Sequence, residues 1–178
     1  MKGRLLYVVG PSGSGKDSLI DYVRPHAPAN VAFARRTITR LASAGGEQHI
    51  AVTPHDFEEL LASGAFAMHW RANGLAYGIG REILDWLAQG RTVVVSGSRA
   101  YLSQALAAFP DLEVVSITAS DETLRARLVA RSRESAAEIE ARLARATALQ
   151  VPPGTVVHEI PNDGDLAHGG ERLLALLA

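Results

Sequence analysis

Gly10-Pro11-Ser12-Gly13-Ser14-Gly15-Lys16-Asp17-Ser18 directly follows the apolar run Leu5–Val9 and precedes a segment with helical periodicity. This run matches the pattern Gly-x-x-x-x-Gly-Lys, in which glycines allow successive backbone N–H groups to turn inward around an anion. The positive N-terminal end of the following helix adds to the attraction for phosphate. A plain glycine-rich turn is the alternative, but the strand–loop–helix context favours a phosphate-binding loop.

Lys16 stands out because the chain contains 16 arginines and only two lysines. Chance is one explanation. The other is that this position requires a compact ammonium, which acts toward phosphate as a point charge. We predict that Lys16 contacts the β- and γ-phosphates of ATP and stabilises charge during phosphoryl transfer.

Asp17 departs from the usual motif, which ends in a Ser or Thr whose hydroxyl binds Mg²⁺. The carboxylate is followed by Ser18, the last residue of the predicted ATP-binding run. A carboxylate is a good hard-oxygen ligand, so Asp17 is the candidate Mg²⁺ contact, either directly or through water. Alternatively, Asp17 only stabilises the helix N-terminus as an acidic residue in the first turn.

Short β-branched runs alternate with longer helical patterns along most of the chain. This alternation predicts an α/β fold with a parallel sheet flanked by helices. Together with the phosphate-binding loop, it predicts a fold of the P-loop NTPase type. The expected strands are 5–9, 31–35, 92–96, 112–118 and 155–160, and the expected helices are 16–24, 80–89, 99–108, 120–130, 135–149 and 165–177.

We expect one domain over residues 1–178, with a core formed by 1–35, 81–130 and 150–178. Residues 36–80 interrupt the alternation with two or three short strand-like pieces and a helix that begins after Thr53, so they are predicted to form a substrate-binding insertion. Residues 131–149 are rich in arginine, and the family resemblance described below implies that they form a lid.

The composition excludes several kinds of site. The chain of 178 residues has no cysteine, which rules out disulfides, thiolate metal sites and a cysteine nucleophile. Its formal net charge of −1 favours neither a nucleic-acid nor a membrane partner. No apolar run approaches the roughly 20 residues of a membrane span, and the N-terminus leaves no room for a signal peptide, so we expect a cytoplasmic protein. The oligomeric state cannot be read from this sequence.

The sequence resembles the guanylate-kinase-like branch of the nucleoside monophosphate kinases over nearly its whole length. The resemblance rests on the phosphate loop, Thr37-Ile38-Thr39-Arg40, Gly74–Gly78, Arg131-Ser132-Arg133 and Asn162-Asp163. Within that branch it is most similar to the ribose 1,5-bisphosphate phosphokinase family, which is linked to phosphonate utilisation. The closer match is carried by Lys16-Asp17-Ser18, Ile38–Arg40, Ala42–Gly45, His49–Ala51, Ala72–Leu75, Gly97–Ala100, Glu138–Ala146 and Asn162–Gly164.

The resemblance implies an ATP-dependent kinase that uses Mg²⁺ with ATP. It implies that Arg131 and Arg133 lie on the lid over ATP, that Arg142 lies near the transferring phosphate, and that Asn162 lies near adenine. With Lys16, the expected catalytic residues are therefore Arg131 and Arg142. The acceptor is an already ionised phosphate, so no general base is required. Arg125 and Arg127 are expected to be solvated.

The predicted acceptor site differs from that of guanylate kinases. By alignment, the serine and glutamate with which those enzymes recognise guanine are replaced by Arg36 and His69, and His49 replaces a phosphate-binding residue, while Arg40 and Tyr77 are retained. A site with so many cations suits a sugar that carries phosphate at both ends. The expected reaction converts ribose 1,5-bisphosphate to 5-phospho-α-D-ribosyl 1-diphosphate, with release of ADP.

Each acceptor residue also has a structural alternative. Arg36 could be solvated beside Arg35 at a strand end, His49 and His69 could be hydrogen-bonded structural histidines, and Tyr77 could pack at a turn. A guanylate or other nucleoside monophosphate kinase is the alternative function, and an inactive binding module is a third. The last is disfavoured because both the loop and the lid are intact. Guanylate kinases carry acids after the central strand, whereas this chain has Ser96-Gly97-Ser98 there, which leaves Mg²⁺ to Asp17 or mainly to ATP and water.

Overall fold

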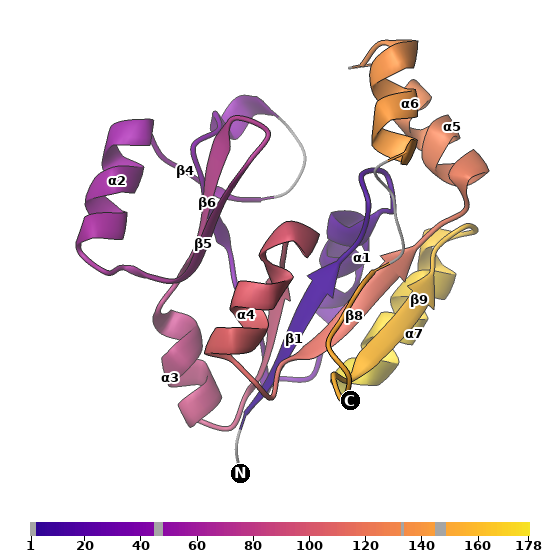
Figure 1. Ribbon diagram of the computed structural model, residues 1–178. Coiled ribbons are helices and arrows are strands. Elements are labelled where there is room, and N and C mark those ends of the chain that lie inside the picture. Colours follow the sequence, from indigo (N-terminus) through magenta and orange to yellow (C-terminus); the bar gives the residue numbers. More distant parts are fainter. Residues whose placement is uncertain (1–2, 45–47, 133, 145–148) are drawn as a thin grey trace.

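A five-stranded parallel sheet forms the centre of the computed structural model, which describes residues 3–44, 48–132, 134–144 and 149–178 (Figure 1). Its strand order is β2-β7-β1-β8-β9, and every neighbouring pair is parallel. The strands are β1 (Arg4–Val9), β2 (Val31–Phe33), β7 (Thr92–Ser96), β8 (Glu113–Thr118) and β9 (Val157–Pro161). The predicted α/β class with a parallel sheet is confirmed.

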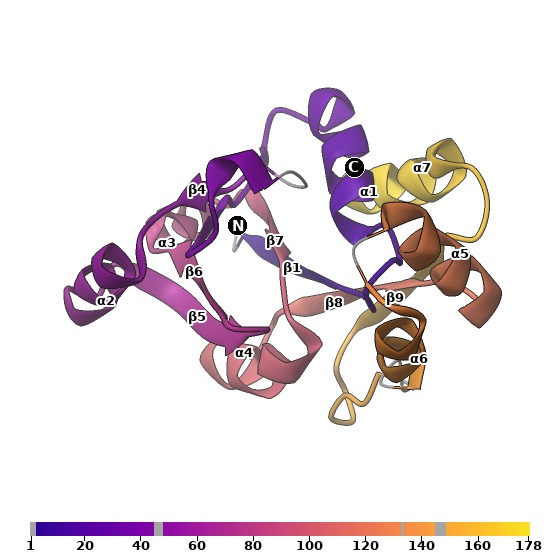
Figure 2. The same cartoon turned by 90° about the horizontal axis from the view of Figure 1, so that it is seen from above.

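The two faces of this sheet are covered by different helices, because alternate side chains of each strand point to opposite sides. Leu5, Tyr7 and Val9 pack against α3 (Glu82–Ala88) and α4 (Leu102–Ala108). Leu6 and Val8 pack against α1 (Lys16–Val23) and α7 (Leu166–Leu177). Figure 2 shows α1 and α7 on one side of β1 and α4 on the other. Strands buried on both faces explain the uninterrupted apolar runs in the sequence.

A second sheet lies within residues 36–80. Its order is β4-β3-β6-β5, formed by β3 (Arg36–Ile38), β4 (Ile50–Ala51), β5 (Phe66–Ala72) and β6 (Leu75–Gly80). The expectation of two or three strand-like pieces was therefore too low. Strands β5 and β6 form a hairpin whose turn residues, Asn73 and Gly74, both have positive φ, which is typical of a type I′ turn. Met68, Trp70 and Ile79 join the same core cluster as β1.

Three further helices lie around the loop that follows β1. Helix α2 (Pro54–Ala62) begins with the predicted Thr53 cap, which forms a reciprocal capping box with Asp56. Helix α5 (Asp121–Arg131) packs against α6 (Ala136–Ala144), and short 3₁₀ segments lie at Arg24–His26, Ala42–Ala44 and Arg99–Tyr101. In Figure 1 the second sheet with α2 and the α5–α6 pair stand on either side of the loop after β1. No described helix combines the length and apolar character needed to cross a bilayer.

Candidate active site

The loop between β1 and α1 has the backbone shape that its glycines predict. Gly13 and Gly15 have φ values of 87° and 83°, in the left-handed region that favours glycine. Gly15 is the N-cap of α1. A methyl group at Gly10 would lie 2.5 Å from the Ser14 hydroxyl oxygen, so that position also excludes a side chain. The loop therefore reverses tightly and leads directly into the positive end of a helix.

Asn162 and Arg127 support this loop through hydrogen bonds to its backbone carbonyls. The buried Asn162 amide donates to the Ser14 carbonyl at 2.7 Å, and Arg127 donates to the carbonyls of Gly13 at 3.2 Å and Ser14 at 3.3 Å. Because the carbonyl and the following N–H of a trans peptide point in opposite directions, fixing Ser14 O turns the Gly15 N–H toward the open side of the loop. Arg127 also binds the carbonyl of Asn162 at 2.7 Å, which ties the two supports together.

These contacts change two expectations. Arg127 is not a solvated residue, and that prediction was wrong. Its position between Leu124 and Leu128, both buried on α5, was the available signal, because i+3 and i+4 neighbours share a helix face. Asn162 is 3% exposed and faces the loop, so its contact with adenine stays a prediction. Arg125, by contrast, is exposed and pairs with Glu140 at 2.9 Å.

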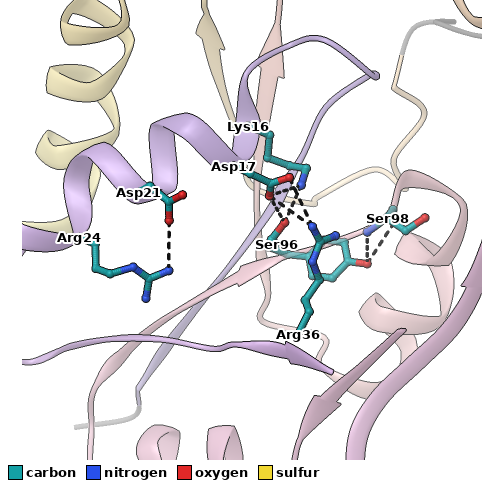
Figure 3. Close-up of polar contacts among 8 residues, drawn as sticks. Lys16, Asp17, Asp21, Arg24, Arg36, Ser96 and Ser98 are labelled. Atoms are coloured by element: carbon teal, nitrogen blue, oxygen red, sulfur yellow. Dashed lines mark hydrogen bonds and ion pairs between the residues drawn. The ribbon is translucent and has the colours of Figure 1, made fainter. Parts of the chain in front are cut away.

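Lys16, Asp17 and Ser96 form a compact polar group at the carboxyl end of β7 (Figure 3). The Lys16 ammonium donates to Asp17 Oδ1 at 2.8 Å and to Ser96 Oγ at 2.5 Å. The Ser96 hydroxyl donates to the same Asp17 oxygen at 2.7 Å. Ligands of open parallel sheets bind at the carboxyl ends of the strands, so this group lies where a phosphate ligand is expected.

Arg36 connects this group to the second sheet. Its guanidinium lies 3.4 Å from each Asp17 carboxylate oxygen and 5.5 Å from the centre of the Tyr77 ring. The Arg36 side chain is 10% exposed, which contradicts the alternative of a solvated strand-end residue; Arg35 is the exposed member of that pair. A buried cation that contacts both a carboxylate and an aromatic face is held in a defined position.

The pKa of Asp17 reflects this crowding of charge. Burial alone raises the pKa of the carboxyl, but the charges of Lys16 and Arg36 and the hydrogen bonds from Lys16 and Ser96 outweigh it. The net effect holds the pKa of Asp17 far below its ordinary value. The carboxylate is therefore ionised at every physiological pH.

Asp17 and Ser96 also fit the chemistry of a magnesium ion bound with nucleotide. They offer a carboxylate oxygen and a hydroxyl oxygen, and Mg²⁺ usually takes one or two such protein ligands together with phosphate oxygens and water. In the part of the chain that the structure describes, no three His, Cys, Asp or Glu side chains gather as a protein-only metal site.

The other predicted acceptor residues divide into two groups. Buried His49 lies 3.0 Å through Nε2 from the Arg40 carbonyl and 3.4 Å through Nδ1 from the Arg40 guanidinium, so these two residues form one unit in which Nε2 carries the proton. Tyr77 stacks on Trp70 with ring centres 5.5 Å apart and lies on the same sheet face as Arg36. His69 is exposed and alternates with buried Trp70 along β5, so the structure does not bring it to that face.

The lid contacts the loop through one of its predicted arginines. Arg142 donates to the Ser12 hydroxyl at 3.0 Å and pairs with Glu134 at 2.9 Å. Arg131 lies exposed at the last residue of α5, and Arg133 lies outside the described residues.

A cavity of about 330 Å³ opens beside the loop, between α5 and β9. Its volume is that of a small-molecule site.

Comparisons with known proteins give consistent matches. The chain is 50% identical to the ribose 1,5-bisphosphate phosphokinase of Pseudomonas fluorescens, over 99% of this chain and 96% of that protein. It is 51% identical to the protein of the same name from Chromobacterium violaceum, over 98% and 94% of the two chains. No protein-family model matches.

Solved structures show the same fold at low identity. The guanylate kinase of Anaplasma phagocytophilum superimposes with a TM-score of 0.69 at 19% identity, over 99% of this chain and 85% of that one. A gluconokinase from Sinorhizobium meliloti 1021 superimposes with a TM-score of 0.51 at 21% identity, over 98% and 91% of the two chains. At such identities the likeness establishes the fold and not the substrate.

Proposed function

This chain belongs to the ribose 1,5-bisphosphate phosphokinase family, and from that premise we propose that it transfers the γ-phosphoryl group of ATP to ribose 1,5-bisphosphate. The acceptor oxygen belongs to the 1-phosphate. Its attack on the γ-phosphorus breaks the bond to the bridging oxygen, which leaves with ADP. The products are 5-phospho-α-D-ribosyl 1-diphosphate and ADP.

The observation that carries the proposal is the buried Arg36 guanidinium on β3, which faces the phosphate loop through Asp17. A nucleoside monophosphate needs no permanent cation where its base binds. A sugar with phosphate at both ends does, because each phosphate must be neutralised as water is removed. The Arg40–His49 unit and Tyr77 supply further hydrogen-bonding groups in the same subdomain. His69 stays a proposed contact, but it lies on the opposite face of the second sheet from Tyr77, so the acceptor could reach it only if that face turned toward the site.

On the donor side, the loop residues 10–18 bind the phosphates of ATP. Lys16 and Arg142 place positive charge beside the phosphoryl group that is transferred. Arg142 already contacts the loop through Ser12, which supports this role. Arg131 and Arg133 are proposed to act from the lid. Bound Mg²⁺ would be held by Asp17 and the nucleotide, and it supplies neutralisation of phosphate charge. The reacting acceptor needs alignment and charge neutralisation, and no proton is removed by a side chain.

We assign the roles of the chain segments accordingly. Residues 1–35, 81–130 and 150–178 form the nucleotide-binding core, residues 36–80 the acceptor subdomain, and residues 131–149 the lid. Closure of the second sheet and of the α5–α6 pair toward the loop would exclude water from the reaction. Because the reaction consumes ATP, we place it in the cytoplasm.

The acceptor decides between this proposal and its rival. Purified protein is supplied with Mg·ATP and either ribose 1,5-bisphosphate or GMP, and ADP release is followed by a coupled assay. Turnover of the sugar bisphosphate alone supports the proposal. Preference for GMP would make the protein a nucleoside monophosphate kinase, and turnover of neither acceptor would favour an inactive binding module.

A further inference from the structure

Two positions of this site carry exchanged residue types. In P-loop enzymes generally, Mg²⁺ is held by a Ser or Thr hydroxyl directly after the loop lysine and by an acid at the end of a neighbouring strand. Here the residue after Lys16 is the carboxylate, Asp17, and the end of the neighbouring strand β7 carries the hydroxyl, Ser96. The chain thus has both chemical groups, each on the element where the other is expected.

The geometry brings the exchanged groups together. Strands β1 and β7 are paired in register, with Val8 opposite Ser96, so the end of β7 lies beside the start of the loop. Ser96 Oγ lies 2.7 Å from Asp17 Oδ1 although the residues are 79 positions apart in sequence. The hydroxyl and the carboxylate therefore occupy one place in the site.

The two oxygens also converge on a positive charge. The Lys16 ammonium lies 2.8 Å from Asp17 Oδ1 and 2.5 Å from Ser96 Oγ. A point where a carboxylate and a hydroxyl both face one cation is suited to cations with oxygen ligands. Binding of nucleotide phosphate would draw Lys16 toward the β- and γ-phosphates and leave both oxygens facing the phosphates.

Ser96 is the residue of this strand end whose side chain contacts Asp17. The next residue, Gly97, excludes any side chain, because a methyl group there would lie 2.1 Å from the Tyr7 ring. The backbone of Ser98 is held by Tyr7: its N–H donates to the Tyr7 hydroxyl at 2.9 Å, and its carbonyl accepts from that hydroxyl at 3.0 Å. Among Ser96, Gly97 and Ser98, Ser96 is therefore the residue whose side chain meets Asp17.

We propose that Asp17 and Ser96 form a reciprocal pair that positions Mg²⁺ on bound ATP, with the carboxylate supplied by the loop and the hydroxyl by the strand. This inference rests on the proposed use of Mg·ATP. It adds Ser96 as a metal-positioning residue. It also explains why an acid at the strand end is dispensable in this chain: its charge has moved to the loop.

The test measures metal affinity rather than turnover. Mn²⁺ is titrated into each variant saturated with a non-hydrolysable ATP analogue, and bound Mn²⁺ is quantified by electron paramagnetic resonance. We expect Asp17→Ser to weaken Mn²⁺ binding by roughly 10- to 100-fold, and Ser96→Ala to weaken it by a smaller factor. The double variant Asp17→Ser/Ser96→Asp, which restores the usual arrangement, should recover most of the loss.

Two matched controls make the result specific. Ser98→Ala removes a neighbouring hydroxyl and should leave Mn²⁺ affinity unchanged, and Asp17→Ser/Ser98→Asp returns the carboxylate two residues away and should bind as weakly as Asp17→Ser. Thermal unfolding followed by circular dichroism confirms that the variants fold. Recovery absent in the Ser96→Asp double variant, or present equally in the Ser98→Asp one, would overturn the inference.

The outcome is separable from that of the proposed function. Suppose that the wild-type protein does not phosphorylate ribose 1,5-bisphosphate, but that Mn²⁺ affinity falls in Asp17→Ser and recovers in Asp17→Ser/Ser96→Asp. The acceptor assignment is then wrong and the reciprocal pair stands. If the wild-type protein makes the expected product but the Asp17→Ser/Ser96→Asp variant binds Mn²⁺ as weakly as Asp17→Ser, the acceptor assignment stands and the reciprocal pair is wrong.

Discussion

Asp17 on the phosphate loop and Arg36 on β3 form an ion pair, with the guanidinium nitrogen 3.4 Å from both carboxylate oxygens. This pair joins the element proposed to bind ATP to the sheet proposed to bind the acceptor. Both side chains lie at the carboxyl end of the central sheet, where the two substrates must meet for in-line transfer. The Asp17–Arg36 pair is thus the physical link between the proposed donor and acceptor sites.

Replacing Arg36 by Met should impair acceptor binding more than ATP binding. Loss of a charge-assisted contact to phosphate costs about 2–4 kcal/mol, so kcat/KM for ribose 1,5-bisphosphate should fall roughly 30- to 1,000-fold. KM for ATP should change by only a few-fold. Arg35→Met is the matched control, because Arg35 is exposed. Equal effects of the two changes on the acceptor would argue against Arg36 as a substrate contact.

Lys16→Ala should lower kcat by several orders of magnitude, because it removes a positive charge that acts on the transferring phosphoryl group. Single-turnover measurements with saturating ATP separate this loss from a loss of nucleotide binding. Asp17 would lose one of its partners, the ammonium at 2.8 Å, so the fold of the variant should be verified by thermal unfolding. Near-normal turnover in a folded variant would contradict the assignment of the loop.

Arg127→Met should loosen the phosphate loop. The change removes hydrogen bonds to three backbone carbonyls, those of Gly13, Ser14 and Asn162. Ser14 keeps its bond from the Asn162 amide, whereas the buried carbonyls of Gly13 and Asn162 lose their Arg127 donor, at a cost of about 1–3 kcal/mol. Both the free energy of unfolding in urea and the affinity for ATP should decrease. Arg125→Met, on the exposed face of the same helix, should leave the free energy of unfolding nearly unchanged, because its ion pair with Glu140 is exposed to solvent. If the two variants have the same free energy of unfolding and the same affinity for ATP, Arg127 does not support the loop.

The lowered pKa of Glu113, a residue away from the active site, predicts that the stability of the protein depends on pH. Hydrogen bonds from Arg4, at 2.9 Å, and from His158, at 2.7 Å, lower the pKa of Glu113 to about 2 in the folded protein. An unfolded glutamate titrates near roughly 4.3. The folded state thus binds this proton less readily, so the stabilisation is complete above the unfolded pKa and disappears as the pH falls toward 2.

The difference in unfolding free energy between wild type and Glu113→Gln should accordingly be constant above about pH 5 and shrink between there and pH 2. Urea unfolding at a series of pH values measures this difference. Glu171→Gln, on the exposed side of α7, serves as the control. A difference that grows on acidification would mean that the sign of the Glu113 linkage is wrong.

Much of the fold follows from local patterns. Thr92–Ser96 is predicted as a strand with its observed bounds, because an apolar β-branched run buried on both faces has no helical alternative of that length. The Thr53 cap and Pro54 start α2 as expected. Strand β6 was harder to predict, since Leu75–Gly80 contains three small residues and becomes a strand only by pairing with β3 and β5.

The site was predictable in its residue types and less so in its contacts. The loop, Lys16 and Asp17 come from a contiguous motif. Ser96 and Arg127 do not, because their importance depends on strand register and on helix packing between segments far apart in sequence. His69 shows the converse: alignment assigns it to the acceptor site, whereas the alternation of β5 turns it away from the face that carries Tyr77.

Acceptor preference tests the central claim most directly. The protein is incubated with Mg·ATP and either ribose 1,5-bisphosphate or GMP, kcat/KM is determined for each, and the sugar product is identified by ³¹P nuclear magnetic resonance. We predict a product with the paired signals of a diphosphate at C1, ADP in equal amount, and negligible turnover of GMP. Efficient conversion of GMP to GDP with no diphosphate formed on the sugar would contradict the account.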